Sequence, residues 1–300
     1  MRCKVTAKSH IRCLFRSRFR AFLALFFVFS YKKLSFASCK APSNYNIIKI
    51  KMPTALVFAA GLGTRLKPLT DTMPKAMVPV YGEPLIAHTL RRLKAAGFDR
   101  AVVNVHHFGQ QIIDFISEND FGIEVAISDE RDCLLDTGGG LRKAAPLLTA
   151  QEPDAPILIH NVDILSNADL PAFLAAAQEN DVTLLVNRRD TKRYLLFDAD
   201  NRLCGWTNIE TGEVRTPYPA LDPASCKRLA FSGLHVVKPK IFAPMQAYPE
   251  RFPIMEFYLE QCDKLRIRAY EQPGLQLIDV GKLDTLAKAE EFLKENVCGF

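Results

Sequence analysis

The sequence predicts an α/β fold: a Rossmann-like, mostly parallel sheet flanked by helices, with further strands added at the C-terminal end. Three observations lead to this prediction. Short aliphatic runs alternate with amphipathic patterns from residue 52 onward, which is typical of βαβ units. A glycine-rich segment follows the first run directly, where such folds bind ligands. The chain is 48% hydrophobic and long enough to bury a large core.

The first part of this region is predicted to alternate strands and helices. Pro84 and Gly97 bracket the first helix, as expected because proline favours helix starts and glycine favours helix ends. The predicted strands are 55–60, 101–105, 124–128, 156–160 and 182–186. The predicted helices are 85–96, 110–118, 140–148 and 170–179.

The pattern changes after residue 186. Two short runs, 194–197 and 203–206, flank an Asp/Asn-rich turn and predict a hairpin. No linker separates this part from the first, so we expect residues 52–300 to form one domain. The remaining predicted elements are strands at 229–237, 266–270 and 275–280, and helices at 254–262 and 283–295.

Charge divides the chain at Met52. The net charge of +6 combines residues 1–51, with twelve basic and no acidic residues, and a remainder with 27 basic and 33 acidic residues. A nucleic-acid binder is excluded, since its excess of Lys and Arg would lie in the folded part. We expect Met52 to be the true start. The alternative is a secretory signal, because the apolar run 21–30 follows four arginines and is shorter than the roughly 20 residues of a membrane span.

The eight cysteines show no metal-ligand or disulfide spacing. Five of them are scattered through residues 52–300, which favours reduced thiols and a cytoplasmic protein. We expect no membrane partner for this part of the chain.

The most informative segment directly follows the first predicted strand. Gly61 and Gly63 permit backbone N–H groups to approach a phosphate closely. Arg65 and Lys75 supply two positive charges, of which the guanidinium can bind phosphate through two parallel hydrogen bonds. A dinucleotide fingerprint and a P-loop are both excluded, because each requires glycine where this chain has Leu66.

Other candidate positions leave alternatives open. The glycine-rich turn 137–140 precedes a helix and suits an anionic or polar ligand, but a flexible loop has the same composition. Asp163 follows a buried strand pattern, where it either binds a ligand or opens a turn. His160 is expected to pack at a strand end. His106 and His107 would point to opposite faces of a strand and cannot bind one metal together.

These motifs resemble those of the sugar-1-phosphate nucleotidyltransferases. The segments that carry the resemblance are Gly61-Leu-Gly-Thr-Arg-Leu-Lys-Pro-Leu-Thr, Met73-Pro-Lys-Ala-Met-Val-Pro-Val, Gly82-Glu-Pro-Leu-Ile, Thr137-Gly-Gly-Gly, Asn161-Val-Asp163, Phe231-Ser-Gly-Leu-His and Ile278-Asp-Val-Gly281. They cover almost all of 53–296 in the family order.

The resemblance implies a nucleotide-diphospho-sugar transferase fold and a Mg²⁺-dependent reaction. A nucleoside triphosphate and a sugar 1-phosphate would yield an NDP-sugar and pyrophosphate. The implied residues are Arg65 and Lys75 for catalysis, Asp163 and Asp279 for the metal, Asn161 for the sugar phosphate, and Gly61, Gly63, Thr64, Glu130 and Gly138 for the nucleotide.

Within the family, the chain resembles most the short bacterial N-acetylmuramate 1-phosphate uridylyltransferases. UTP and this sugar phosphate are therefore the expected substrates, in peptidoglycan recycling. A mannose-1-phosphate guanylyltransferase or another NDP-sugar pyrophosphorylase is the alternative, and a noncatalytic nucleotide-sugar sensor is an alternative of another class. Val162 stands where the family has glycine, and 193–197 departs from the muramate enzymes. The basic run 188–193 is either a solvated surface or a rim that attracts the sugar phosphate.

Overall fold

The computed structural model of the chain describes residues 53–296. The expectations for residues 1–51, a start at Met52 or a signal-like segment, lie outside the described residues. None of the helices within 53–296 has both the length and the apolar composition needed to cross a lipid bilayer.

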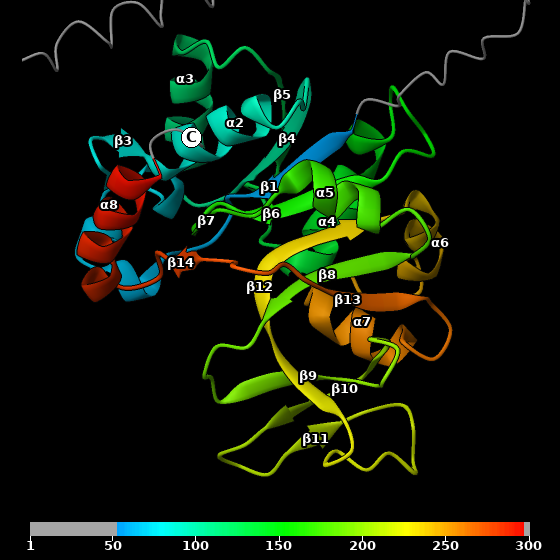
Figure 1. Ribbon diagram of the computed structural model, residues 1–300. Coiled ribbons are helices and arrows are strands. Elements are labelled where there is room, and N and C mark those ends of the chain that lie inside the picture. The colour runs from blue at the N-terminus through cyan, green and yellow to red at the C-terminus, as the bar shows by residue number, and fades with distance from the viewer. Residues whose placement is uncertain (1–52, 297–300) are drawn as a thin grey trace, which may run out of the picture. The chain divides into compact units, whose positions relative to one another are not determined.

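A parallel set of strands forms one side of the main sheet (Figure 1). Strand β1 (Thr54–Phe58) pairs in parallel with β4 (Arg100–Val105) on one side and β6 (Ile157–Asn161) on the other. β5 (Glu124–Asp129) pairs in parallel with β4 at the edge. All four strands are largely aliphatic runs close to the predicted positions, so the predicted parallel sheet is confirmed.

Strand β12 (Lys227–Val237) runs antiparallel to the strands beside it and completes the main sheet. It lies between β6 and β8 (Val182–Asn187), and β13 (Ile267–Glu271) pairs in parallel with β8 at the far edge. The register between β12 and β8 shifts between Phe231 and His235. Such an irregularity bends a strand and redirects its side chains.

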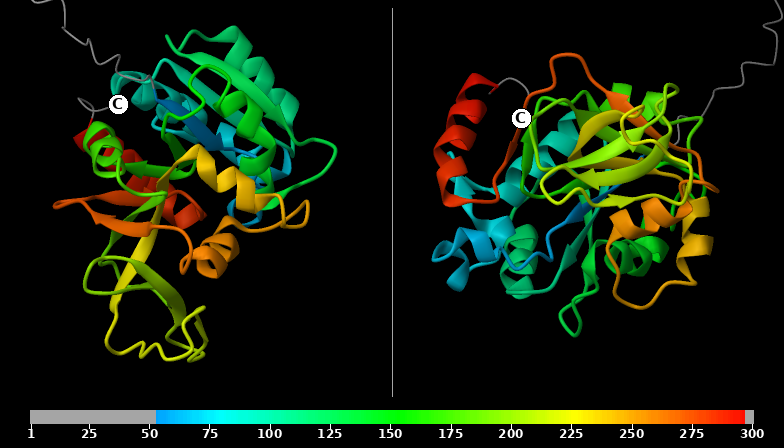
Figure 2. Two further views of the ribbon diagram at one scale, coloured as in Figure 1. Left: turned by 90° about the vertical axis from the view of Figure 1, so that its right-hand side faces the viewer. Right: turned by 90° about the horizontal axis from the view of Figure 1, so that it is seen from below.

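The first residues of β12 belong to a second set of strands. Residues 227–229 pair with β9 (Arg193–Phe197), which pairs in turn with β10 (Leu203–Asn208) and through it with β11 (Val214–Arg215). The predicted hairpin is therefore confirmed as β9 and β10. Figures 1 and 2 show these strands extending away from the parallel part of the sheet at the end of β12.

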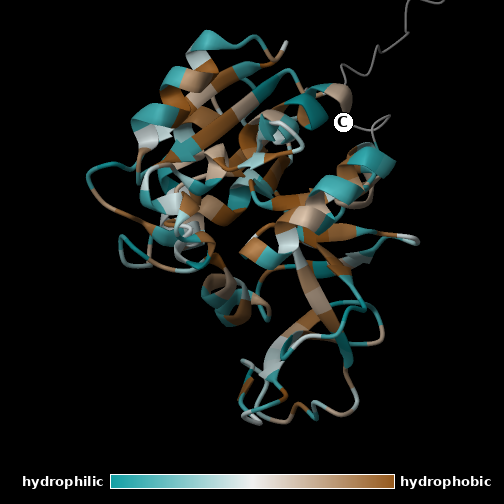
Figure 3. Ribbon diagram, turned by 90° about the vertical axis from the view of Figure 1, so that its left-hand side faces the viewer, coloured by the Kyte–Doolittle hydropathy of each residue, from teal (hydrophilic) through white to brown (hydrophobic). Residues whose placement is uncertain are grey.

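Helices cover both faces of the main sheet. One hydrophobic core holds the apolar sides of the helices on one face, and a second core holds those on the other. The helices of the first face are α2 (Leu85–Ala95), α3 (Gly109–Glu118), α5 (Leu170–Ala176) and α8 (Leu286–Glu295). Those of the second are α4 (Asp136–Leu148), α6 (Phe242–Met245) and α7 (Ile254–Gln261). Figure 3 shows the apolar residues gathered in the strands and the polar residues on outward helix surfaces.

Two short pairs of strands lie outside the main sheet. β2 (Pro79–Val80) pairs with β3 (Glu83–Pro84) just before α2. The strand predicted at 275–280 is shorter, β14 (Leu277–Asp279), and pairs antiparallel with β7 (Ile164–Ser166) instead of extending the main sheet. This pairing brings a late segment of the chain next to the end of β6.

Candidate active site

A cavity of about 440 Å³ lies at the carboxyl ends of β1 and β6. Open α/β sheets bind their ligands at this edge. Eight of the predicted site residues line it: Gly61, Gly63, Thr64, Arg65, Lys75, Glu130, Asn161 and Asp163. The other two do not line it: Asp279 lies at its border, beside the lining residue Gly281, and Gly138 is packed behind it.

Residues 61–65 form the wall of the cavity that follows β1. Gly63 has a φ of +64°, and a Cβ there would lie 2.8 Å from Thr70 Cγ2, so this position requires glycine. The Thr70 hydroxyl donates to the carbonyl of Gly63 at 2.8 Å. Leu66 is buried and anchors the turn, which leaves the preceding Arg65 exposed at the cavity wall.

Lys75 reaches the same cavity from a later turn. Its Nζ forms an ion pair with Asp163 Oδ2. The two side chains are only 11% and 18% exposed, so their charges interact more strongly than a surface pair does. The pair holds a cation and a carboxylate together at the end of β6, although 88 positions separate them in the chain.

The pairing of β7 with β14 brings Asp279 to this point. Asp279 is the partner of Ile164, the residue after Asp163, and Val280 N donates to Asp163 O at 2.8 Å. Burial raises the pKa of the Asp279 carboxyl, and the charge of Asp163 raises it further. Asp279 Oδ1 is buried and has no hydrogen-bond partner among the described residues.

Arg65 joins this group of charges beside Gly281. A Cβ on Gly281 would lie 2.6 Å from Asp279 Oδ1 and 2.8 Å from Arg65 Nη2, so glycine lets both side chains approach the backbone. Two cations, Arg65 and Lys75, and two carboxylates, Asp163 and Asp279, are therefore gathered at one side of the cavity.

The two carboxylates are the residues that fit a divalent metal. Within 53–296, no group of three or more His, Cys, Asp or Glu side chains is arranged to hold a metal ion. Mg²⁺ in phosphate-transfer sites is usually held by one or two carboxylates, with substrate phosphates and waters as the other ligands. The unpartnered, buried Oδ1 of Asp279 beside Asp163 is consistent with a site of this kind.

The cavity lining also includes a buried carboxyl group, that of Glu130. Glu130 follows β5 and is fully buried; its Oε1 accepts a hydrogen bond from Asn104 Nδ2 at 2.8 Å, and its Oε2 has no described partner. Burial raises the pKa of the Glu130 carboxyl, and the bond from Asn104 partly offsets this. Asn104 Oδ1 also accepts from Ala59 N at 2.8 Å, which ties Glu130 to the end of β1.

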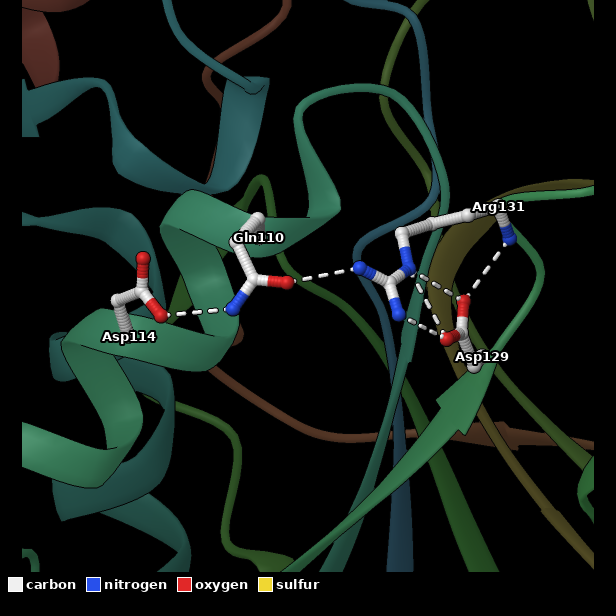
Figure 4. A network of polar contacts seen from close by, with 4 residues as sticks. All are labelled: Gln110, Asp114, Asp129 and Arg131. Atoms are coloured by element: carbon white, nitrogen blue, oxygen red, sulfur yellow. Dashed lines mark hydrogen bonds and ion pairs between the residues drawn. The ribbon is translucent and has the colours of Figure 1, made fainter.

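The residues on either side of Glu130 are exposed and fix the loop that carries it. Arg131 binds Asp129 through both carboxylate oxygens and donates to Gln110 Oε1 on α3 at 2.7 Å (Figure 4). Gln110 in turn donates to Asp114 at 2.7 Å. This surface network holds the turn after β5 against α3, while Glu130 lies buried at the cavity.

The prediction of a glycine-rich turn at 137–140 is wrong. Helix α4 begins at Asp136, so Gly138 lies within its first turn. Gly138 N donates to Phe252 O at 2.8 Å, and a Cβ on Gly138 would lie 2.3 Å from the Phe252 ring. Glycine is needed here because the helix backbone packs directly on Phe252. Tertiary contacts of this kind can favour glycine in a helix despite its low helix propensity.

Asp136, which was not predicted as a site residue, lines the cavity together with Thr137 of the predicted segment, whereas Gly138 does not. Asp136 has a φ of +60°, a conformation uncommon for residues other than glycine. Its Oδ1 accepts from Thr137 N at 2.7 Å, and its Oδ2 accepts from no described residue. Thr137 Oγ1 accepts from Ile254 N at 2.9 Å. An Asp in the first turn of a helix is an N-terminal signal that could have indicated this helix start.

Val162, the departure from the family pattern, is 3% exposed and packs in a hydrophobic core. Its N–H donates to Phe58 O at 3.2 Å, which fixes the backbone between Asn161 and Asp163. The expected effect of this valine on the fit of the sugar stays a prediction.

Two buried histidines do not line the cavity. Burial lowers the pKa of His160 to about 4 and that of His235 to about 3, so both are neutral near pH 7. His160 Nδ1 bonds with Asn161 O at 2.8 Å, and His235 Nδ1 bonds with the Tyr258 hydroxyl at 2.6 Å. His160 packs at a strand end, as predicted.

Comparison with known proteins agrees with this geometry. The family model for nucleotidyl transferases matches residues 54–296. The chain belongs to this family.

Relatives of this nucleotidyl transferase act on sugar phosphates. An N-acetylmuramate alpha-1-phosphate uridylyltransferase of Neisseria meningitidis is 32% identical over 240 residues, which span 79% of this chain and 96% of that protein. A mannose-1-phosphate guanylyltransferase of Mycobacterium tuberculosis is 34% identical over 141 residues, 45% of this chain and 37% of that protein. The resemblance found in the sequence is therefore confirmed.

The fold is also that of solved nucleotidyl transferase relatives. The crystal structure of HddC from Yersinia pseudotuberculosis superposes with a TM-score of 0.64 at 22% identity, over 81% of this chain and all of that one. At this level of identity the likeness concerns the fold alone.

Proposed function

We propose that this nucleotidyl transferase joins UTP to a sugar 1-phosphate, with N-acetylmuramate 1-phosphate as the preferred sugar. An oxygen of the sugar phosphate attacks the α-phosphorus of UTP. The new P–O bond forms as the bond to the β-phosphate oxygen breaks. The products are a UDP-sugar and pyrophosphate.

The observation that carries this proposal is the gathering of Arg65, Lys75, Asp163 and Asp279 at one side of the cavity. The reaction brings two polyanions together, so its barrier falls when fixed positive charges neutralise the phosphates. Such charges are most effective when they are held in place before the substrate binds. The Lys75–Asp163 pair, which is largely shielded from water, meets that requirement.

Each charged residue takes one task in this proposal. Arg65 orients the triphosphate and stabilises the charge on the departing pyrophosphate. Lys75 holds the α-phosphate beside the sugar phosphate, which Asn161 contacts. Asp163 and Asp279 hold Mg²⁺, which when bound neutralises phosphate charge.

The carboxyl groups in the cavity lining suit the nucleoside. Uracil N3–H and the ribose hydroxyls are donors, and the carboxylate oxygens of Glu130 and Asp136, which line the cavity, are acceptors. Gly61, Gly63 and Thr64 form the wall along the phosphates. Gly138 contributes indirectly in this proposal, because its contact with Phe252 sets the position of the first turn of α4.

The extent of similarity favours the muramate substrate over mannose. The match covers 96% of the Neisseria uridylyltransferase but only 37% of the mycobacterial guanylyltransferase. UTP and a sugar 1-phosphate of this type support the proposal of a cytoplasmic reaction in peptidoglycan recycling.

The test is a pyrophosphate-release screen of the purified protein with Mg²⁺. UTP, GTP, CTP and dTTP are each combined with 1-phosphates of N-acetylmuramate, N-acetylglucosamine, glucose and mannose. We expect the highest kcat/KM with UTP and N-acetylmuramate 1-phosphate. Turnover confined to GTP and mannose 1-phosphate would overturn the substrates but keep the reaction class. UTP binding without any pyrophosphate release would instead identify a nucleotide-sugar sensor.

A further inference from the structure

A second hollow of about 740 Å³ lies beside β14. Its walls are residues 187–189 after β8, residues 275–278 and one side of α8. Gly281 lines the first cavity, so Asp279 lies in the chain between the two hollows. In the proposed reaction the sugar extends away from the nucleotide, so this neighbouring hollow is the candidate space for it.

Arg189 connects the second hollow to the catalytic side of the first. Its Nη2 donates to Phe231 O at 3.0 Å, where β12 begins its irregular stretch. Gly233, two residues later, has a φ of +81°, and a Cβ there would lie 3.1 Å from Asn161 Nδ2. The same short piece of β12 therefore contacts both Arg189 and the residue assigned to the sugar phosphate.

Arg189 forms no ion pair with a described carboxylate, although Glu291 and Glu295 line the same hollow. The adjacent Arg188 forms an ion pair with Glu271 at 2.8 Å, whereas no described carboxylate lies within ion-pair distance of Arg189. Arg189 is an exposed cation at the wall of the second hollow.

We propose that Arg189 binds a carboxylate carried by the sugar and so makes the enzyme prefer a sugar-acid 1-phosphate over a neutral one. This inference rests on the proposed function. The planar guanidinium binds a carboxylate through two parallel hydrogen bonds, and one backbone contact to Phe231 leaves donors free for it. N-acetylmuramate carries such a carboxylate on its lactyl ether, and N-acetylglucosamine is the same sugar without it.

The test compares these two sugar 1-phosphates at saturating UTP. kcat/KM is measured by pyrophosphate release for the wild type, Arg189→Ala and Arg189→Lys. We expect Arg189→Ala to lower kcat/KM about 10-fold to 100-fold for the muramate substrate and less than about threefold for the neutral sugar, as the loss of one charged hydrogen-bonding partner predicts. Arg189→Lys keeps the positive charge but not the two parallel hydrogen bonds of the guanidinium. Its kcat/KM for the muramate substrate should therefore fall less than that of Arg189→Ala.

Lys192→Ala is the matched control, since Lys192 lies three residues after Arg189, is paired with Glu210 and does not line the second hollow. We expect it to leave the ratio between the two sugars unchanged. An equal loss on both sugars in Arg189→Ala would overturn the inference, because Arg189 would then act on the shared phosphate. A wild type that prefers the neutral sugar also overturns it, while nucleotidyl transfer stands. No pyrophosphate release with any sugar overturns the proposed function and this inference with it.

Discussion

Two glycine-rich segments of this chain look alike in sequence and serve opposite purposes. In residues 61–65, a Cβ on Gly61 would meet nothing within 4 Å. In residues 138–140, a Cβ on Gly139 would lie 2.3 Å from Glu250 O, and one on Gly140 would lie 2.7 Å from Glu130 Oε1. Gly61 leaves room for a ligand, whereas Gly138, Gly139 and Gly140 leave room for the protein's own atoms.

The difference shows that glycine before or within a helix start does not by itself identify a ligand site. What distinguishes the two segments is the partner that fills the space beside the backbone. For Gly138 and Gly139, that partner comes from residues 250–252, more than 100 positions later. For Gly61, the space is the cavity itself.

Arg65→Ala should have the largest effect on activity. It removes a charge from the phosphate side of the cavity, so we expect kcat/KM to fall about 10²-fold to 10³-fold, as for the loss of one stabilising donor at a reacting group. The free energy of unfolding should hardly change, because the side chain is exposed. Pyrophosphate release and urea unfolding measure the two quantities.

Arg142→Ala is the control from the other segment. Arg142 Nη1 donates to Met245 O at 2.9 Å and to Tyr248 O at 2.8 Å, and Nη2 donates to Pro249 O at 2.7 Å. Its loss should lower the urea midpoint and leave kcat/KM of the folded protein near the wild-type value. Equal instability of the Arg65 and Arg142 variants would contradict the comparison.

Gly138→Ala should have the largest effect on stability among the single-methyl changes. The added Cβ overlaps the Phe252 ring and lies 2.7 Å from its carbonyl, so the helix or the loop must move. We expect a loss of about 1–3 kcal/mol in the free energy of unfolding. Thermal denaturation measures it, and turnover should persist well below the melting temperature. A stable variant with a raised KM for UTP would instead show that Gly138 contacts the nucleotide.

Gly61→Ala should have the smallest effect of these changes, and it should alter substrate binding more than stability. No atom obstructs the new Cβ, so the free energy of unfolding should change by less than about 0.5 kcal/mol. The methyl group occupies space in the cavity, so KM for UTP should rise by up to about tenfold, or about 1.4 kcal/mol. Steady-state kinetics with UTP varied, beside a melting curve, separates the two effects. A large drop in stability with unchanged KM would reverse the assignment of this segment.

Local patterns were sufficient for most of the fold. The parallel strands are largely aliphatic runs close to their predicted positions, and the hairpin around residues 198–202 follows from its Asp/Asn turn. The pairing of β14 with β7 could not be predicted, because both strands have three residues and meet across more than 100 positions. The start of α4 was misplaced because glycine has a low helix propensity, and the packing that overrides it comes from distant residues.

The residues of the candidate site likewise fall into those that local sequence patterns could predict and those that they could not. Arg65 and Lys75 lie in one recognisable segment, and Asp163 lies at a strand end, where a simple rule for α/β sheets places ligands. Asn104 and Asp136 were not predicted. Asn104 is an isolated polar residue in an apolar strand, and the role of Asp136 depends on a left-handed backbone that the sequence does not announce.

That left-handed backbone at Asp136 has a genetic consequence. Every aspartate codon is one base change from a glycine codon, and glycine would relieve about 1 kcal/mol of backbone strain at this position. A single mutation thus offers greater stability at the loss of a carboxylate in the cavity. Laboratory populations selected only for a heat-resistant protein should acquire Asp136→Gly early, whereas populations that grow only when the enzyme works should keep aspartate.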